Sequence, residues 1–352
     1  MKRRLGRTNL MVSIIGFGAI KLPLIDKKTA SDILNRALDL GINFIDTARA
    51  YGDSEEKIGL AISDRRNEFY ISTKSTARTY REMKKDIETS LKNLRTDHID
   101  LYLCHNLRYQ NDYEKVMSPN GALRALKEAK EEGIIGHIGF SCHRFHETME
   151  KGIRSGEFEA IMVSYNILND ELVEESILPL AKEMDVGVIA MKPLAGGFLA
   201  APPPELAEKT RIPINVETAL RFILSNNAVT TAIPGMMKLE EVEENAYIGE
   251  NFTKMSEDEM KALREAIESS IREFCRGCGY CQPCPQEIRI PIILRQLAYY
   301  KYYGLKEWAK WRYKMVEVKA DSCIECKQCV EKCPYGLNIP EMLKEAHRLL
   351  SS

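Results

Sequence analysis

Four polar residues in the first third of the chain stand at or just beyond the ends of apolar segments. Asp46 ends one short apolar run, and Tyr51 follows five residues later in a loop that contains glycine. Lys74 and His105 each end a longer apolar run. A lysine beside a tyrosine stabilises the developing phenolate, and a carboxylate keeps that lysine charged. Together, the four side chains could transfer a proton to a reacting oxygen.

Each of these residues also has an ordinary structural interpretation. A buried aspartate can cap a helix, a loop tyrosine can simply pack, and a lysine at a strand end usually extends its ammonium group to water. The combination is more informative, because the four residues lie at the ends of three successive strands separated by helical segments. In a (β/α)8 barrel such strand ends converge on one face. We therefore expect the four side chains to meet.

The elements that would position these residues follow one another regularly. Expected strands lie at 13–18, 43–46, 69–74, 99–105, 134–142, 158–166, 186–194 and 228–235. One expected helix lies around 33–38 and ends near Gly41, and the next has Ser54 as its N-cap. Apolar residues at helical spacing predict a third helix, and segments 175–184 and 216–224 are also expected to be helical; the apolar residues are Met83, Ile87, Leu91 and Leu94. Strand and helix alternate through about residue 250, which predicts an all-parallel TIM barrel after a short N-terminal hairpin. We expect the barrel in residues 1–270 and a second domain in residues 271–352.

The polar residues and their neighbours resemble the aldo-keto reductase family. The matching phrases are Phe44-Ile-Asp-Thr-Ala with Tyr51-Gly and Glu55, Ser72-Thr-Lys74, and Leu103-Cys-His105-Asn. The resemblance implies reduction of a carbonyl, or oxidation of an alcohol, with a nicotinamide cofactor. Tyr51 would protonate the carbonyl oxygen, Lys74 and Asp46 would support it, and His105 would orient the carbonyl.

The same resemblance places the nicotinamide cofactor at the later strand ends. Ser141 would bond the carboxamide, and the expected contacts for the pyrophosphate and the adenosine end are Met191, Pro193, Leu194, Gly196, Gly235, Lys238, Glu244 and Asn245. The sequence departs from the family's pattern at three positions: Met191 replaces an aromatic ring, Cys142 an asparagine and Met162 a glutamine. Lys238 favours NADP(H), whereas the glutamates at 240, 241, 243 and 244 leave NAD(H) open.

Eight of the ten cysteines fall in two runs near the C-terminus. The first run is Cys275, Cys278, Cys281 and Cys284, and the second is Cys323, Cys326, Cys329 and Cys333. The last cysteine of each run precedes a proline, and the two runs begin about 48 residues apart, as in a repeated unit. Disulfides are a poor interpretation for a chain expected in the cytoplasm, and a pair of zinc sites is the main alternative.

Each run resembles the pattern of bacterial two-cluster ferredoxins, in which the fourth cysteine binds the other cluster. The resemblance implies one [4Fe–4S] cluster on Cys275, Cys278, Cys281 and Cys333, and another on Cys323, Cys326, Cys329 and Cys284. The first run has one residue fewer before its last cysteine. Between the runs, residues 292–315 are helical in character, which fits an α-helical ferredoxin module. Their aromatic residues could pack inside the module or against the barrel, or form a partner surface: Tyr299, Tyr300, Tyr302, Tyr303, Trp308 and Trp311.

Composition excludes several classes of function. A formal net charge of −1 argues against nucleic acid as the main partner. The sequence contains no run of about 18 apolar residues, so we expect no membrane span. The first residues lack the apolar core of a signal peptide, so we expect a cytoplasmic location.

Three functional hypotheses follow from the two halves of the chain. The protein could be a carbonyl reductase whose clusters exchange electrons with a redox partner protein, a reductase with purely structural clusters, or an electron carrier with a relic barrel. Nicotinamides move two electrons as hydride, whereas each cluster moves one. A flavin usually mediates between the two, and we find no flavin fingerprint. The loops carry no decisive charged group that would identify the substrate.

Overall fold

The protein is described by a computed structural model that covers two compact units. The first comprises Met1–Pro193 and Ala219–Met255, and the second comprises Leu194–Thr218 and Ser256–Ser352. The described residues are 1–108, 110–143, 145–168, 172–197, 199–200, 214–270, 275, 279–302, 306–333 and 336–351, without the side chains of 268–270 and 302. The boundary expected near residue 270 stays a prediction.

Eight parallel strands form the sheet of the first unit, each paired with its neighbours in sequence order. They are β3 (Phe17–Gly18), β4 (Phe44–Asp46), β5 (Tyr70–Ser75), β6 (Ile99–Cys104), β7 (Ile135–Cys142), β8 (Ala160–Ser164), β9 (Gly187–Met191) and β10 (Val229–Ile233). Two further parallel bridges, Ile15 with Ala232 and Gly18 with Gly235, connect the first strand to the last. These bridges close the sheet into the predicted TIM-like barrel.

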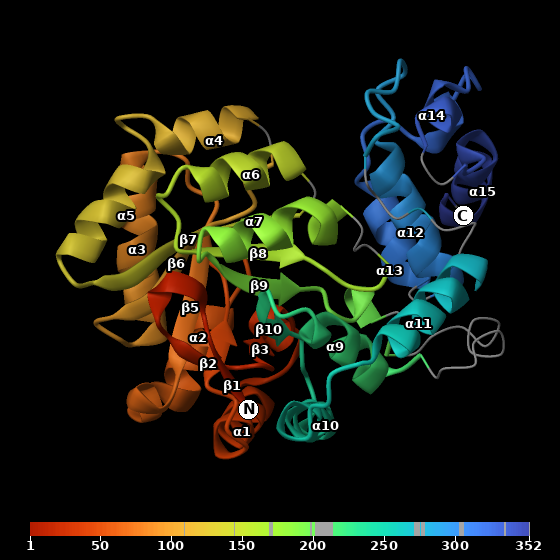
Figure 1. Ribbon diagram of the computed structural model, residues 1–352. Coiled ribbons are helices and arrows are strands. Elements are labelled where there is room, and N and C mark those ends of the chain that lie inside the picture. Colours follow the sequence, from red (N-terminus) through yellow and green to blue (C-terminus); the bar gives the residue numbers. More distant parts are fainter. Residues whose placement is uncertain are drawn as a thin grey trace. The chain divides into compact units, whose positions relative to one another are not determined.

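Helices surround the strands, as Figure 1 shows. They are α1 (Lys27–Asp39), α2 (Ser54–Ile62), α3 (Tyr80–Leu94), α4 (Gln110–Met117), α5 (Ala122–Glu131), α6 (His146–Arg154), α7 (Leu178–Glu183), α9 (Val216–Ser225) and α10 (Leu239–Glu250), with a π-helical segment at Val173–Ile177 and 3-10 segments at Gly6–Thr8, Ala19–Leu24 and Ser63–Glu68. A further 3-10 segment, Ala195–Gly197, belongs to the second unit. Gly41 follows α1 with φ +82°, a conformation that suits glycine and ends the helix where the sequence predicts. On α3, Met83, Ile87 and Leu94 are buried as expected.

Two local predictions were wrong. Segment 13–18 is not one strand: Ser13 belongs to β2 (Met11–Ser13), which pairs with β1 (Lys2–Arg4) in an antiparallel hairpin, and only Phe17 and Gly18 form the barrel strand. The N-cap of α2 is Asp53 rather than Ser54. Ser54 is the first helical residue, and its hydroxyl group bonds the Thr47 hydroxyl and the Ala19 carbonyl instead.

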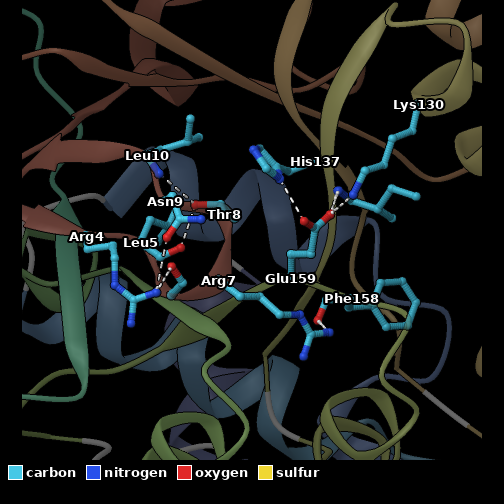
Figure 2. A network of polar contacts seen from close by, with 12 residues as sticks. Arg4, Leu5, Arg7, Thr8, Asn9, Leu10, Lys130, His137, Phe158 and Glu159 are labelled. Atoms are coloured by element: carbon cyan, nitrogen blue, oxygen red, sulfur yellow. Dashed lines mark hydrogen bonds and ion pairs between the residues drawn. The ribbon is translucent and has the colours of Figure 1, made fainter.

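The N-terminal hairpin closes the end of the barrel at which the strands begin. Leu5 and Val12 are fully buried in a core cluster with strand residues such as Leu101 and Ile189. Figure 2 shows Arg7 reaching the carbonyl oxygen of Phe158, at 2.8 Å, just before β8. The opposite end, where the strands finish, is therefore the end that can hold a site.

A second polar group lies close to this hairpin. Glu159 accepts hydrogen bonds from Lys130 Nζ at 2.6 Å and from His137 Nδ1 at 2.7 Å, as Figure 2 shows. The carboxylate precedes β8 and contacts β7, so it ties neighbouring strands together at the closed end.

The second unit is built from helices, and its described residues contain no β-strand. The helices are α11 (Glu257–Ser270), α12 (Ile290–Tyr302), α13 (Lys306–Lys314), α14 (Gln328–Glu331) and α15 (Ile339–Leu350), with a 3-10 segment at Ala320–Ser322. The stretch expected to be helical at 292–315 thus forms two helices. The core of the unit includes Cys281, Cys329 and the buried leucines of α12 and α15. This arrangement agrees with an α-helical module.

The aromatic residues of this unit divide into two groups. Tyr299 and Tyr300 pack against the core. Trp308 and Trp311 are 49% and 46% exposed and lie against each other, with ring centroids 5.0 Å apart, so a partner surface stays a prediction for them. Tyr303 and the side chain of Tyr302 lie outside the described residues. Among the helices that the structure describes, none combines the length and apolar character needed to cross a membrane.

Candidate functional site

A buried ion pair lies at the ends of strands β4 and β5. Lys74 Nζ is 2.6 Å from Asp46 Oδ2 and donates a second bond, of 2.7 Å, to the Thr47 carbonyl oxygen. Ser72 donates to the other carboxylate oxygen of Asp46 at 3.1 Å, because Ser72 is paired with Asp46 across the two strands. Lys74 is only 1% exposed. A buried ammonium group is tolerated only with such partners.

Tyr51 and His105 complete the group. The Lys74 ammonium lies 4.9 Å from the centre of the Tyr51 ring. The Tyr51 and His105 rings stand edge to face, with centroids 5.9 Å apart. The structure therefore brings together all four residues that the sequence predicts as a catalytic group.

The surroundings define the protonation states of this group. Burial opposes the charged form of Lys74, but Asp46 and Tyr51 outweigh it and hold the lysine pKa above its usual range. Burial raises the pKa of the Tyr51 phenol, and the nearby lysine partly offsets this effect. Near neutral pH, Lys74 is charged and Tyr51 keeps its proton. Tyr51 can therefore act as a proton donor.

His105 is neutral in this environment. Burial, followed by the charges of Lys74, Arg78 and Arg108, lowers the pKa of His105 to about 3. Its Nδ1 atom is buried and has no hydrogen-bond partner among the described residues. A neutral imidazole can orient a carbonyl group by a hydrogen bond without acting as an acid.

A second buried carboxylate fixes the loop that carries Tyr51. Glu55 is 1% exposed and accepts bonds of 2.8 Å from the hydroxyl groups of Thr73 and Ser90. It also forms an ion pair with Arg49, which lies between Asp46 and Tyr51. In the sequence, Glu55 stands out as part of the family-like motif that includes Tyr51, without any indication of its partners. Arg49 was missed, because its partner cannot be read from local spacing.

Two residues expected at the cofactor have polar atoms that are suited to binding. Ser141 Oγ is buried and accepts the Asn106 backbone N–H at 2.8 Å, which leaves the hydroxyl proton available for a carboxamide oxygen. Asn245, on α10, is 3% exposed, and its Oδ1 atom has no partner within the described part of the chain. An unsatisfied buried oxygen of this kind fits a ligand that supplies a donor, as an adenine amino group would.

The remaining cofactor positions are spread over the two units. Met191 ends β9 and is 8% exposed, and Pro193 lies in the same unit. Gly235 pairs with Gly18, and Lys238 and Glu244 are exposed at the start and on the surface of α10. Leu194 and Gly196 belong to the second unit, so their meeting with the other contacts stays a prediction.

The cations near the expected adenosine end include one that the sequence did not reveal. The side chain of Lys21 lies 3.5 Å from the position that a Cβ atom on Gly235 would occupy. Of the nearby glutamates, Glu241 accepts the Met237 backbone N–H at 2.7 Å. Lys21 therefore lies beside Gly235, one of the positions expected at the adenosine end.

One of the two predicted cysteine groups is assembled in the second unit. Cys284, Cys323, Cys326 and Cys329 line one cavity, together with Cys281 and the prolines at 283 and 285. Burial raises the pKa of the Cys329 thiol, and the neighbouring Cys323, Cys326 and Cys284 add to this shift. The four residues expected to share a cluster are thus close to one another. Cys284 comes from the first run and the other three from the second. The ferredoxin pattern predicts this arrangement, because the fourth cysteine of a run binds the cluster of the other run.

The other cysteine group is described only in part. Cys275, Cys281 and Cys333 are described, whereas Cys278 lies outside the described residues. Over the described ranges, no three His, Cys, Asp or Glu side chains converge closely enough to bind a single metal ion.

Both parts of the chain match known families. Residues 14–211 match the aldo/keto reductase family. Residues 274–338 match the 4Fe-4S dicluster domain, which implies iron–sulfur clusters.

Individual relatives resemble the barrel. The chain is 28% identical over 315 residues to the uncharacterized oxidoreductase YqkF of Bacillus subtilis, covering 78% of this chain and 99% of that protein. It is 28% identical over 308 residues to L-galactose dehydrogenase of Arabidopsis thaliana, covering 76% and 95%. The holo form of aldo-keto reductase AKR11C1 from Bacillus halodurans superposes with a TM-score of 0.66 at 29% identity, covering 75% of this chain and 95% of that one.

Proposed function

Because this chain belongs to the aldo/keto reductase family and carries a region that matches a 4Fe-4S dicluster domain, we propose that it reduces small carbonyl compounds with a nicotinamide cofactor, and oxidises the corresponding alcohols. The observation that carries this proposal is the buried Lys74–Asp46 ion pair beside Tyr51 and His105.

In this proposal the chain's own residues supply the proton and hold the carbonyl group in its orientation. A nicotinamide, when bound, would supply a hydride to the carbonyl carbon. Tyr51 would give its proton to the carbonyl oxygen, so that the carbonyl becomes an alcohol. Lys74 stabilises the phenolate that remains, and Asp46 keeps Lys74 charged. Neutral His105 holds the carbonyl oxygen by a hydrogen bond.

Cofactor binding rests on the residues with available polar atoms. Ser141 would orient the nicotinamide carboxamide, and Asn245 would accept from the adenine. Lys238, with Lys21 nearby, favours the 2′-phosphate of NADPH. We propose NADPH as the preferred donor, with NADH as the alternative.

Replacing Tyr51 by phenylalanine tests the role of this residue. Tyr51→Phe keeps the ring but removes the proton, so we expect carbonyl turnover to fall by roughly 10²- to 10⁴-fold while nicotinamide binding persists. Steady-state kinetics and fluorescence titration of NADPH measure the two effects. Tyr70→Phe is the matched control, because Tyr70 begins β5 at the other end of the barrel from Lys74. Near-normal turnover in Tyr51→Phe would show that the group is misassigned.

For the second domain, we propose two [4Fe–4S] clusters. The chain's own residues would hold one on Cys284, Cys323, Cys326 and Cys329, and the other on Cys275, Cys278, Cys281 and Cys333. We favour clusters that exchange electrons with a redox partner protein, and purely structural clusters are the alternative. This assignment is supported by the position of Cys284, which belongs to the first run but lies with the cysteines of the second run.

Iron analysis tests this assignment. Protein purified without oxygen should contain about eight iron and eight sulfide per chain. Cys284→Ser should selectively weaken the cluster of the second run, although Cys284 itself lies in the first. Cys104→Ser, a buried barrel cysteine, is the control and should keep all the iron. Stoichiometric zinc without sulfide would contradict the proposal.

A further inference from the structure

Two arginines surround the strand end that carries His105. Arg78 Nη2 donates to the His105 carbonyl oxygen at 2.9 Å and to the Asn106 carbonyl oxygen at 3.1 Å. Arg108 lies two residues beyond Asn106. With the Asn106 amide turned so that its oxygen faces Arg108, that oxygen accepts from Arg108 Nε at 2.8 Å and from Nη2 at 3.0 Å. Both guanidinium groups are therefore held beside the proposed catalytic histidine.

The charges around these arginines do not cancel. Asp112 is the nearby carboxylate: it lies 3.6 Å from Arg78 Nε and accepts the Arg108 backbone N–H at 3.3 Å. Asp46 already neutralises Lys74, and His105 is uncharged. Among the described residues, Arg78 and Arg108 thus share the single carboxylate of Asp112, so this group of three keeps a net positive charge beside His105.

The two arginines differ in their accessibility. Arg78 Nε is buried and makes no hydrogen bond with any described residue, although Asp112 lies 3.6 Å away as its ion-pair partner. Arg108 is exposed, so its guanidinium group is accessible to a ligand. The described hydrogen bonds of the Arg108 guanidinium group go to the neutral amide oxygen of Asn106, so its charge stays available for a carboxylate, which an arginine can bind with two hydrogen bonds.

The position of the pair favours the substrate over the cofactor. Arg78 and Arg108 follow β5 and β6, next to Lys74 and His105. The residues expected at the cofactor phosphates follow β9 and β10 instead. Tyr51 and His105 would protonate and orient the carbonyl group, so a positive charge beside His105 would face the rest of the same molecule.

We propose that the substrate is an aldehyde or ketone that also carries a carboxylate, and that Arg108, supported by Arg78, binds this carboxylate and determines specificity. The inference rests on the proposed carbonyl reductase function. Arg78 would also position His105 through the two carbonyl oxygens, so Arg108 is the better residue to test.

A matched pair of aldehydes tests the proposal kinetically. With NADPH, the wild-type protein should reduce 4-carboxybenzaldehyde with at least about tenfold higher kcat/KM than the uncharged 4-formylbenzamide. Arg108→Gln should lower kcat/KM for the acid by about 10- to 100-fold, chiefly through KM, and change the value for the amide less than about twofold. The control Arg81→Gln removes the same charge from the exposed surface of α3 and should affect neither substrate selectively.

A binding experiment separates this inference from the reductase function. Calorimetry with benzoate and benzamide, without nicotinamide, should detect benzoate binding that Arg108→Gln abolishes and Arg81→Gln retains. Loss of benzoate binding in Arg108→Gln supports the anion site even if neither aldehyde is reduced. Failure to reduce either aldehyde would overturn only the reductase proposal. Equal rates for acid and amide in the wild-type protein, or equal losses in Arg108→Gln, would overturn the inference and leave carbonyl reduction standing.

Discussion

A charged lysine, a protonated tyrosine and a neutral histidine lie close together, with the lysine buried and both rings half-buried. Burial and three neighbouring cations lower the pKa of His105 to about 3, so this histidine becomes charged only in strong acid. Burial raises the pKa of Tyr51, so its proton is lost only at alkaline pH. The group should therefore hold one arrangement of protons across the physiological range.

A pH profile tests this arrangement. For 4-formylbenzamide, which has no charge of its own, kcat/KM for reduction should stay flat from about pH 5 to about pH 9 and fall only as Tyr51 loses its proton. His105→Asn should lower the profile without changing its shape. An acidic limb near pH 6.5 in the wild-type protein that disappears in His105→Asn would show that the histidine titrates, contrary to this account.

The sequence predicts a site residue when the position of that residue depends only on the order of elements along the chain. Asp46, Lys74 and His105 each end an apolar run, and strand ends meet in a barrel whatever the details of packing. Arg78 and Arg49 could not be predicted in the same way. Arg78 bonds backbone carbonyl oxygens 27 and 28 residues away, and any residue type supplies such an oxygen.

At the scale of elements, Glu159 connects β8 with its neighbours at the closed end of the barrel. Burial opposes its charge, but hydrogen bonds from His137 and Lys130 outweigh this and lower its pKa to about 2. The pKa in the unfolded chain is about 4.3. Because the folded pKa is the lower one, the carboxylate contributes stability that is fully present above about pH 4.3 and is lost as the pH falls towards 2.

Removing this charge should destabilise the barrel in a pH-dependent way. Glu159→Gln should lower the free energy of unfolding by about 1–3 kcal/mol at pH 7, with the difference shrinking between about pH 5 and pH 2. Urea unfolding followed by circular dichroism measures this. Glu157→Gln is the control, because Glu157 forms a more exposed ion pair with Lys127 and should cost little. A difference that persists unchanged at pH 3 would contradict the assignment.

Strand and helix alternation predicted the barrel, because each element alone must bury an apolar face. The local predictions were wrong where a contact with a residue elsewhere in the sequence determines the local structure. Ser13 leaves the predicted first strand because its backbone and hydroxyl group bond Asn43, 30 residues away. Ser54 contacts Thr47 and Ala19 instead of capping α2, which no rule of local spacing reveals.

At the scale of the whole molecule, the two proposed halves move electrons differently. The barrel's proposed chemistry moves two electrons as one hydride and needs no iron, whereas a [4Fe–4S] cluster that takes part in electron transfer moves one electron at a time. Cysteine spacing predicted the second domain well, because metal ligands must recur at short intervals. Spacing does not predict whether the clusters take part in carbonyl reduction.

The central claim is that hydride passes directly from the nicotinamide to the carbonyl carbon at the group around Tyr51. The most direct measurement uses NADPH that carries deuterium at the transferred position, with 4-carboxybenzaldehyde, and mass spectrometry of the alcohol formed by intact protein and by protein stripped of iron. We predict one deuterium per alcohol in both samples, since a directly transferred hydride does not exchange with water. Alcohol without deuterium, or loss of reduction when iron is removed and the fold persists, would contradict the account, because the electrons would then pass through another carrier.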